Sequence, residues 1–220
     1  MLNRFILALW ILLAMLSVCT VRAQTAPGSA TLDGARTILR APDSGKKVGD
    51  IDLTGFGFAR EMEIGSGIRV IAISTNDSGG LAAFRNDGSL IRTLKTDKIT
   101  WLQMFDLNED GVSEIVTEEV NGRGTGLLQK SFNLYAVSPQ EIRKVWHAES
   151  YSLDAIPKEV GSKPSVKEKI GYLRFDPSGF GRPARMTYLL ALPMGAILEH
   201  KTYEMRDKTL VQISAEHSRK

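Results

Sequence analysis

The stretch Asp106-Leu107-Asn108-Glu109-Asp110-Gly111-Val112-Ser113-Glu114 is the strongest single indication of how this chain folds. Oxygen-bearing side chains stand at its first, third, fifth and ninth positions, and a glycine stands at the sixth. This spacing is typical of a short loop around a hard cation, because alternate side chains point inward and glycine makes a turn that a Cβ would obstruct. We expect Asp106, Asn108, Asp110 and Glu114 to bind Ca²⁺ through their side chains and Val112 to bind it through its carbonyl.

The alternative for this stretch is a structural turn without an ion, since Asp, Asn and Gly are favoured in turns in any case. A turn alone does not explain the carboxylate of Glu114 at the ninth position. The stretch is not an EF-hand, because Thr117 occupies the twelfth position where that motif has glutamate. An ion would neutralise three carboxylates that repel one another, and its role would be to fix the connection between two strands.

The segments on both sides of the loop are rich in β-branched and aromatic residues, which indicates strands over residues 99–105 and 114–120. Asn86-Asp87-Gly88 and Ser138-Pro139-Gln140 have the composition of turns that close two hairpins. No segment after residue 24 has a sustained helical period, so the sequence predicts an all-β fold. The other predicted strands are residues 68–74, 81–85, 89–94, 132–137, 141–147, 170–175, 184–192, 197–205 and 210–214.

Two stretches are weak copies of the central loop. Residues 52–57 and 176–181 each begin with Asp and have Gly at the sixth position. Phe56 and Phe180 stand where the fifth-position carboxylate should be, so we expect tight turns there rather than further ion sites. A predicted hairpin separates each pair of loops, and the resulting unit of strand, hairpin, strand and loop has the size of a propeller blade.

The segment from Phe105 to Val116 resembles the calcium loops of FG-GAP and VCBS-type repeats, the blades of integrin-α-like β-propellers. The close match covers one repeat, with Glu114 in place of the more usual aspartate. The resemblance implies propeller-like blade repeats, about three four-stranded units in this chain. Because closed propellers have about four to eight blades, we expect an incomplete or open assembly.

Residues 1–23 have the features of a secretory signal peptide. Arg4 precedes an apolar run over residues 5–18, and Ala23 is a small residue before the expected cleavage point. The run is short for a helix that spans a bilayer, so we expect cleavage, export to the periplasm or the medium, and no stable membrane insertion afterwards; an uncleaved anchor is the alternative. Val18 before Cys19 is a poor fit to a lipidation site, so a lipoprotein is not expected.

The sequence divides into four expected parts. They are the signal peptide (1–23), a flexible leader (24–49) that includes a short strand over residues 35–41, a β-repeat domain (50–215) and a tail (216–220).

The chain has 28 basic and 25 acidic residues, a formal charge of +3, and this balance argues against binding to nucleic acid. Its single cysteine, Cys19, lies in the signal peptide, so the mature domain would have no disulfide and a calcium ion would serve as a fastener.

The predicted function is that of an exported, calcium-stabilised β-repeat protein that binds a protein or glycan partner through its loops, without catalysis. One alternative is a periplasmic hydrolase of polysaccharide or phosphate substrates that uses carboxylates such as Asp154, Glu159 or Asp176. Another is a structural or assembly component of a cell-envelope complex, which exposed strand edges would favour.

Residues 122–126 are expected to form a flexible hairpin loop and a candidate binding loop. The aromatic residues expected in the core are Trp101, Trp146, Tyr151 and Tyr172, unless an exposed pair stacks on a sugar.

Overall fold

The computed structural model describes residues 58–157, 163, 165–177, 183–206 and 209–217. These residues form strands and loops only, so the predicted all-β class is confirmed. None of them belongs to a helix with the length and hydrophobicity needed to cross a membrane. The strands are β1 (Phe58–Gly65), β2 (Ile68–Ser74), β3 (Gly79–Arg85), β4 (Leu90–Thr96), β5 (Lys98–Phe105), β6 (Glu114–Gly124), β7 (Leu127–Val137), β8 (Ile142–Asp154), β9 (Lys167–Asp176), β10 (Arg185–Ala191), β11 (Ile197–Arg206) and β12 (Thr209–His217).

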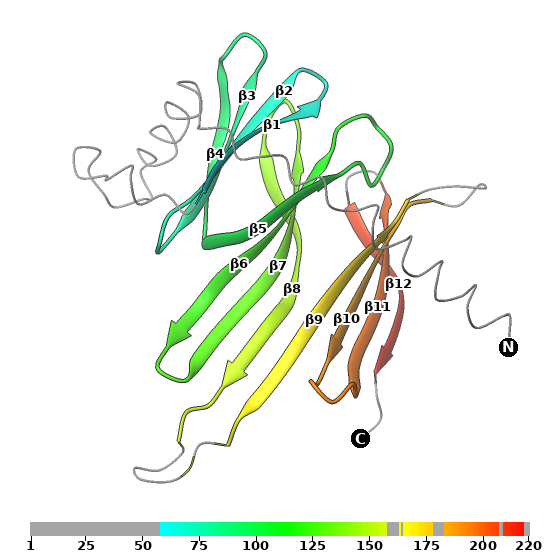
Figure 1. Cartoon of the computed structure of the whole chain (residues 1–220). Coiled ribbons are helices and arrows are strands. Elements are labelled where there is room, and N and C mark those ends of the chain that lie inside the picture. The colour runs from blue at the N-terminus through cyan, green and yellow to red at the C-terminus, as the bar shows by residue number, and fades with distance from the viewer. Residues whose placement is uncertain (1–57, 158–162, 164, 178–182, 207–208, 218–220) are drawn as a thin grey trace, which may run out of the picture.

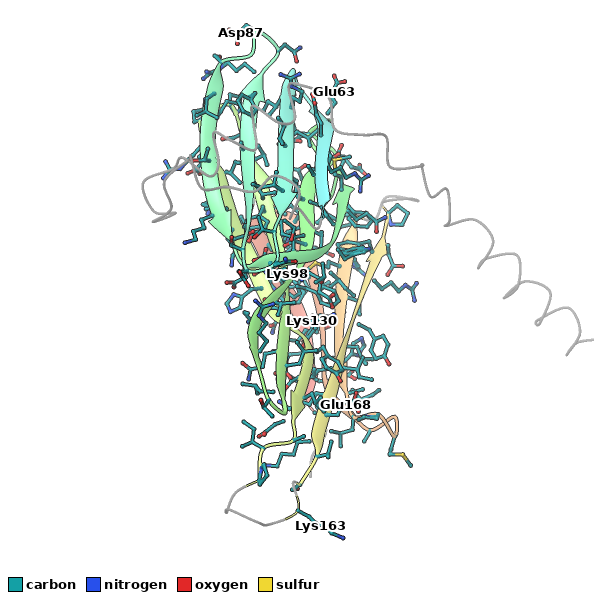
Figure 2. The ribbon with its side chains drawn as sticks, turned by 60° about the vertical axis from the view of Figure 1, so that its left-hand side comes forward. Glu63, Asp87, Lys98, Lys130, Lys163 and Glu168 are labelled. Atoms are coloured by element: carbon teal, nitrogen blue, oxygen red, sulfur yellow. The ribbon has the colours of Figure 1, made fainter. Side chains whose placement is uncertain are left out.

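The strands form two sheets in which every paired neighbour is antiparallel and adjacent in sequence (Figure 1). The small sheet has the order β1-β2-β3-β4, and the large sheet runs from β5 to β12 without interruption. Neither sheet closes on itself, because β5 and β12 remain the two edges of the large sheet. The described residues therefore form a four-stranded and an eight-stranded sheet, where the repeat interpretation expects three four-stranded units. In Figure 2 the small sheet, which carries Glu63 and Asp87, lies at the end of the molecule opposite Lys163.

The two sheets give three layers, because β5–β8 are covered on both faces. Their first face packs against the small sheet, and this first core includes Val70 from β2 together with Ile115 and Tyr135 from β6 and β7. Their second face packs against β9–β12, and this second core joins Val116 and Leu134 to residues such as Met205. Strands with both faces buried need consecutive apolar residues rather than an alternating pattern, which explains the runs in β6 and β7.

The large sheet folds back on itself where β8 and β9 separate. These strands pair only between residues 151–154 and 167–170. Beyond that point Gly171 passes so close to β8 that a Cβ would lie 2.3 Å from the carbonyl oxygen of Glu149. Strand β9 then reaches the middle layer, where Phe175 stacks on Phe105 with ring centroids 3.8 Å apart. The absence of a side chain at Gly171 therefore permits the change from one layer to the next.

A buried carboxylate fixes the passage from the small sheet to the large one. Glu119 is 1% exposed and accepts hydrogen bonds from the Tyr135 hydroxyl at 2.7 Å and from the backbone amide of Asp97 at 3.2 Å. Asp97 lies between β4 and β5, at the crossing between the sheets. Burial and the neighbouring Glu119 carboxylate raise the pKa of Tyr135 well above its ordinary value, which keeps the hydroxyl a donor. Because a buried charge needs such partners, Glu119 is a structural residue.

Most predicted strands coincide with observed ones, which are often longer at their ends. The hairpin of β3 and β4 turns at the predicted glycine, Gly88, with φ of 82°. A hairpin turns within the predicted residues 122–126, but the loop is shorter than predicted, because β6 continues to Gly124 and the turn is confined to Thr125 and Gly126. β12 includes Glu216 and His217, the first two residues of the expected tail. The signal peptide, the leader and residues 52–57 lie outside the described residues.

Candidate functional site

The predicted cation loop connects β5 to β6, as the sequence indicates. Its tight turn places Glu109 at φ of 59° and Gly111 at φ of 78°. Positive φ is uncommon for a residue with a Cβ and costs glycine little. The backbone therefore favours glycine at the sixth position through its φ, although a Cβ there would meet no atom within 4 Å.

The first three predicted ligands hold the loop backbone in this conformation. Asp106 accepts a hydrogen bond from the Gly111 amide at 3.0 Å, and Asn108 accepts one from the Asp110 amide at 3.3 Å. Asp110 accepts one from the Val112 amide at 2.9 Å. The Asn108 amide nitrogen also donates to Asp110 Oδ2 at 3.1 Å. The side chains at the third and fifth positions thus lie in contact on the same loop.

Glu114, the fourth predicted side-chain ligand, begins β6 and is buried at 3% exposure. Its Oε2 accepts a hydrogen bond from the Leu107 amide at 2.9 Å, which closes the loop from its first residues to its last. The pKa of Glu114 is raised to about 7, chiefly by burial and to a smaller extent by the nearby carboxylates of Asp110 and Asp106, against the opposing effect of the Leu107 amide. The three carboxylates of the loop are therefore close enough to influence one another.

The loop also joins the three layers. The Ser113 amide donates to the Ile64 carbonyl at 2.7 Å, and a Cβ on Gly65 would lie 1.9 Å from the carbonyl oxygen of Gly111. The loop backbone is thus pressed against the turn between β1 and β2. Val112 is buried in the first core and Leu107 in the second, so the loop has one side chain in each interlayer interface.

The chemistry of the loop fits calcium, which prefers six to eight oxygen ligands in flexible geometry. Asp106, Asn108, Asp110 and Glu114 contribute carboxylate and amide oxygens, and Val112 stands at the seventh position with its side chain in the core. Within the part of the chain that the structure describes, no group of three or more His, Cys, Asp or Glu side chains lies in an arrangement that could hold a metal ion. Binding would therefore require these side chains to rotate toward a shared ion.

Of the carboxylates proposed for a hydrolase, the two that the structure describes, Asp154 and Asp176, do not come together. Asp154 accepts a hydrogen bond from the Ile156 amide and pairs in register with Lys167, at the start of β9. Asp176 ends β9 and forms an ion pair with Arg174 at 2.6 Å. Asp154 therefore lies beside the first residue of the ten-residue strand β9, whereas Asp176 is the last residue of that strand. Glu159 lies outside the described residues.

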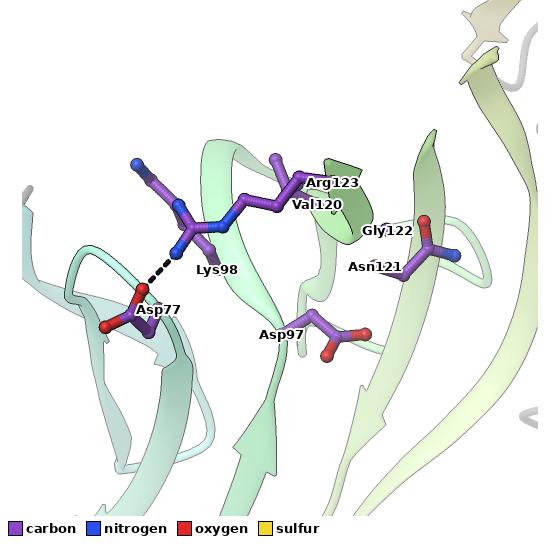
Figure 3. Close-up of a pocket in the computed structure, with 7 residues that line it drawn as sticks. All are labelled: Asp77, Asp97, Lys98, Val120, Asn121, Gly122 and Arg123. Atoms are coloured by element: carbon purple, nitrogen blue, oxygen red, sulfur yellow. Dashed lines mark hydrogen bonds and ion pairs between the residues drawn. The ribbon is translucent and has the colours of Figure 1, made fainter. Parts of the chain in front are cut away.

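A polar hollow of about 180 Å³ lies where the turn between β2 and β3 approaches β6 (Figure 3). Arg123 reaches across it to bind the Asp77 carboxylate and the Asn76 carbonyl. The carboxylate of Asp77 is therefore a partner in an ion pair between the two sheets. The hollow is lined by Asp77, Asp97, Lys98, Val120, Asn121, Gly122 and Arg123.

Sequence reasoning missed a second hollow, of about 310 Å³, on the face of the middle layer that is turned toward β9. It is lined by Trp101, Glu118, Phe132 and Leu173. Trp101 is 39% exposed, so the expectation that it packs in the core was wrong, as it was for Tyr172 at 55% exposure. The register Trp101↔Glu118↔Phe132 places three lining residues on one face of β5–β7, a juxtaposition that strand periodicity alone does not reveal.

Comparison with known proteins gave no match: no family model fits the chain, and no curated protein or solved structure is significantly similar to it.

Proposed function

We propose that this chain is an exported, calcium-stabilised β protein that binds a protein or glycan partner through its surface, without catalysis. The observation that carries the calcium part of this proposal is the loop of residues 106–114. Four oxygen-bearing side chains belong to this one loop, each accepts a hydrogen bond from a loop amide, and the same loop contacts all three layers.

The loop would work as a clasp between the layers. Without an ion, the carboxylates of Asp106, Asp110 and Glu114 repel one another, and the raised pKa of Glu114 reflects part of that repulsion. Ca²⁺ bound to these groups would offset the repulsion and favour their ionised forms. The bond from Ser113 to Ile64 and the contact of Gly111 with Gly65 would then be held by a stiffer loop.

We also propose the propeller-like interpretation in a limited form. The small sheet is an antiparallel meander of four strands, which is the composition of one blade. The Asp of the sequence repeat follows β5 at Asp106 and ends β9 at Asp176, and each of these two strands pairs antiparallel with the next strand in the chain. The related units would thus be strand pairs with their loops, fused into a continuous large sheet.

Export follows from the signal-like residues 1–23, and the mature chain would begin at Gln24. For an exported chain we expect the affinity of an extracellular calcium module, with Kd of about 10⁻⁴ to 10⁻³ M. The mature chain has no cysteine, so the ion would replace a covalent fastener between layers.

Thermal melting of the mature chain tests the calcium part of the proposal. At about 10 mM CaCl₂ the ion should stabilise the fold by about 1.4 to 2.7 kcal/mol relative to EDTA, which is roughly 3 to 10 °C in the melting midpoint. Asp110→Ala should melt at the same temperature in both buffers. Glu109→Gln is the matched control, because it removes a charge from an exposed side chain of the same loop and should keep the calcium response. A wild-type midpoint that does not change with calcium would contradict the proposal.

A further inference from the structure

The second hollow has the architecture of a binding cleft. Trp101 forms an exposed wall, and the Phe132 ring meets it edge-on, with centroids 6.5 Å apart and an interplanar angle of 73°. Leu173 approaches from β9, so the cleft lies between the middle layer and the layer that folds back over it. Its volume of about 310 Å³ is at the lower end of the range for small-ligand sites, about 300 to 1,000 Å³.

Glu118, the polar residue that lines the cleft, is the centre of a network of hydrogen bonds. Its carboxylate accepts hydrogen bonds from the hydroxyls of Thr100 at 2.7 Å and Ser150 at 3.0 Å, and it pairs with the Lys130 ammonium at 3.2 Å. These groups come from four neighbouring strands, β5 to β8. The side chains of Glu118 and Lys130 are only 19% and 26% exposed, and Glu118 is the member of this network that lines the cleft. An occupant of the cleft would therefore meet an aromatic wall on one side and fixed hydrogen-bonding groups on another.

The charge balance of the cleft selects the class of ligand. Because Lys130 already offsets the Glu118 carboxylate, the network offers no uncompensated charge to a cation or an anion. A fully apolar ligand would remove this ion pair from water, which is costly. A pyranose ring suits both the aromatic wall and the polar lining, since its C–H face packs on an indole ring while its hydroxyls donate hydrogen bonds to the Glu118 carboxylate.

We propose that the cleft formed by Trp101, Phe132, Leu173 and Glu118 binds a neutral saccharide. This inference rests on the proposed binding function and narrows its partner to a glycan, at a site separate from the calcium loop. The probe for testing it is cellotriose, a neutral pyranose trimer whose equatorial substituents leave the C–H faces of its rings open.

Titration of the mature chain with cellotriose, followed by ligand-observed NMR in EDTA and again in calcium, tests the proposal. Saturable binding with Kd on the order of 1 mM is expected. Trp101→Ala should weaken binding by about tenfold, and Trp101→Tyr should recover most of it because an aromatic wall remains. Tyr172→Ala is the matched control, since Tyr172 is an exposed aromatic residue that does not line the cleft, and it should leave Kd unchanged.

Absence of saturable binding to the folded wild-type chain would overturn the proposal. So would equal affinity of the wild type and a Trp101→Ala variant whose circular dichroism spectrum is native, or an equal loss in Tyr172→Ala. The melting experiment decides the calcium part separately. If cellotriose does not bind but calcium raises the melting midpoint, the glycan proposal fails and the calcium proposal stands. If cellotriose binds but calcium does not change the midpoint, only the glycan proposal stands.

Discussion

At the scale of single residues, Glu114 is a buried carboxyl group whose protonation affects the stability of the fold. A carboxyl group taken out of water favours its protonated form, and two neighbouring carboxylates add to this effect, so its pKa rises from the ordinary 4.5 to about 7. The folded chain therefore holds a proton at pH values where the unfolded chain has lost it. The contribution of this group to stability is complete below about pH 4.5 and is lost as the pH rises to about 7.

We predict that Glu114→Gln flattens the pH dependence of folding. In EDTA, the free energy of unfolding of the wild type should fall by up to about 3 kcal/mol between pH 5 and pH 8 because of this group. The neutral glutamine keeps an oxygen for the Leu107 amide and removes the titrating proton, so the variant should lose most of that fall. Urea unfolding at both pH values measures it.

The same substitution at Glu109 serves as the control for the pH experiment. Glu109 is exposed in the same loop, and its replacement by glutamine should leave the wild-type pH dependence in place. If Glu114→Gln and Glu109→Gln gave the same pH profile as the wild type, the account of Glu114 as a buried, protonated carboxyl group would be wrong.

At the scale of elements, the turn between β1 and β2 and the loop between β5 and β6 form one contact. Gly65 has φ of +101°, and a Cβ there would lie 1.9 Å from the carbonyl oxygen of Gly111. Any side chain at this position would therefore strain its own turn and push the loop away. The position of the small sheet on the large one thus depends on the absence of a single Cβ.

We predict that Gly65→Ala lowers the free energy of unfolding by at least about 3 kcal/mol, because backbone strain adds to the clash with the loop. Gly88→Ala is the comparison, because Gly88 has a similar φ of +82° with nothing within 4 Å of the added Cβ. It should cost only about 1 to 2 kcal/mol from backbone strain. Urea unfolding of the two variants measures the difference, and equal losses would show that the contact with the loop contributes nothing.

Local elements could be predicted from the sequence, whereas their layering could not. Strand β2 matches its predicted range because β-branched residues fill it, and the turn at Gly88 follows from its Asn-Asp-Gly composition. The sequence around Asp106 indicated the loop because Asp, Asn and Gly favour turns, and in the structure Asp106, Asn108 and Asp110 each accept a hydrogen bond from a loop amide. No local sequence feature indicates that the hydrogen-bonded pairing of β8 and β9 ends at Ile170. The end of this pairing depends on how closely the Gly171 backbone crosses β8. The cleft at Trp101 results from that separation, so it too was beyond sequence reasoning.

At the scale of the whole molecule, one loop contributes side chains to both interlayer cores. The first core lies between the small sheet and the middle layer, and the second lies between the middle layer and β9–β12. Val112 belongs to one and Leu107 to the other, and they are five residues apart on the same loop. A change in the stiffness of this loop would therefore affect the packing at both interfaces at once. An ion bound here would thus affect the stability of the whole fold.

The most direct measurement is an isothermal titration of Ca²⁺ into the mature chain. The account predicts binding at one site with Kd of about 10⁻⁴ to 10⁻³ M, retained in Glu109→Gln and abolished in Asp110→Ala. A wild-type chain that takes up no calcium, or an Asp110→Ala variant that binds it as tightly as the wild type, would contradict the claim that the loop of residues 106–114 is a calcium clasp.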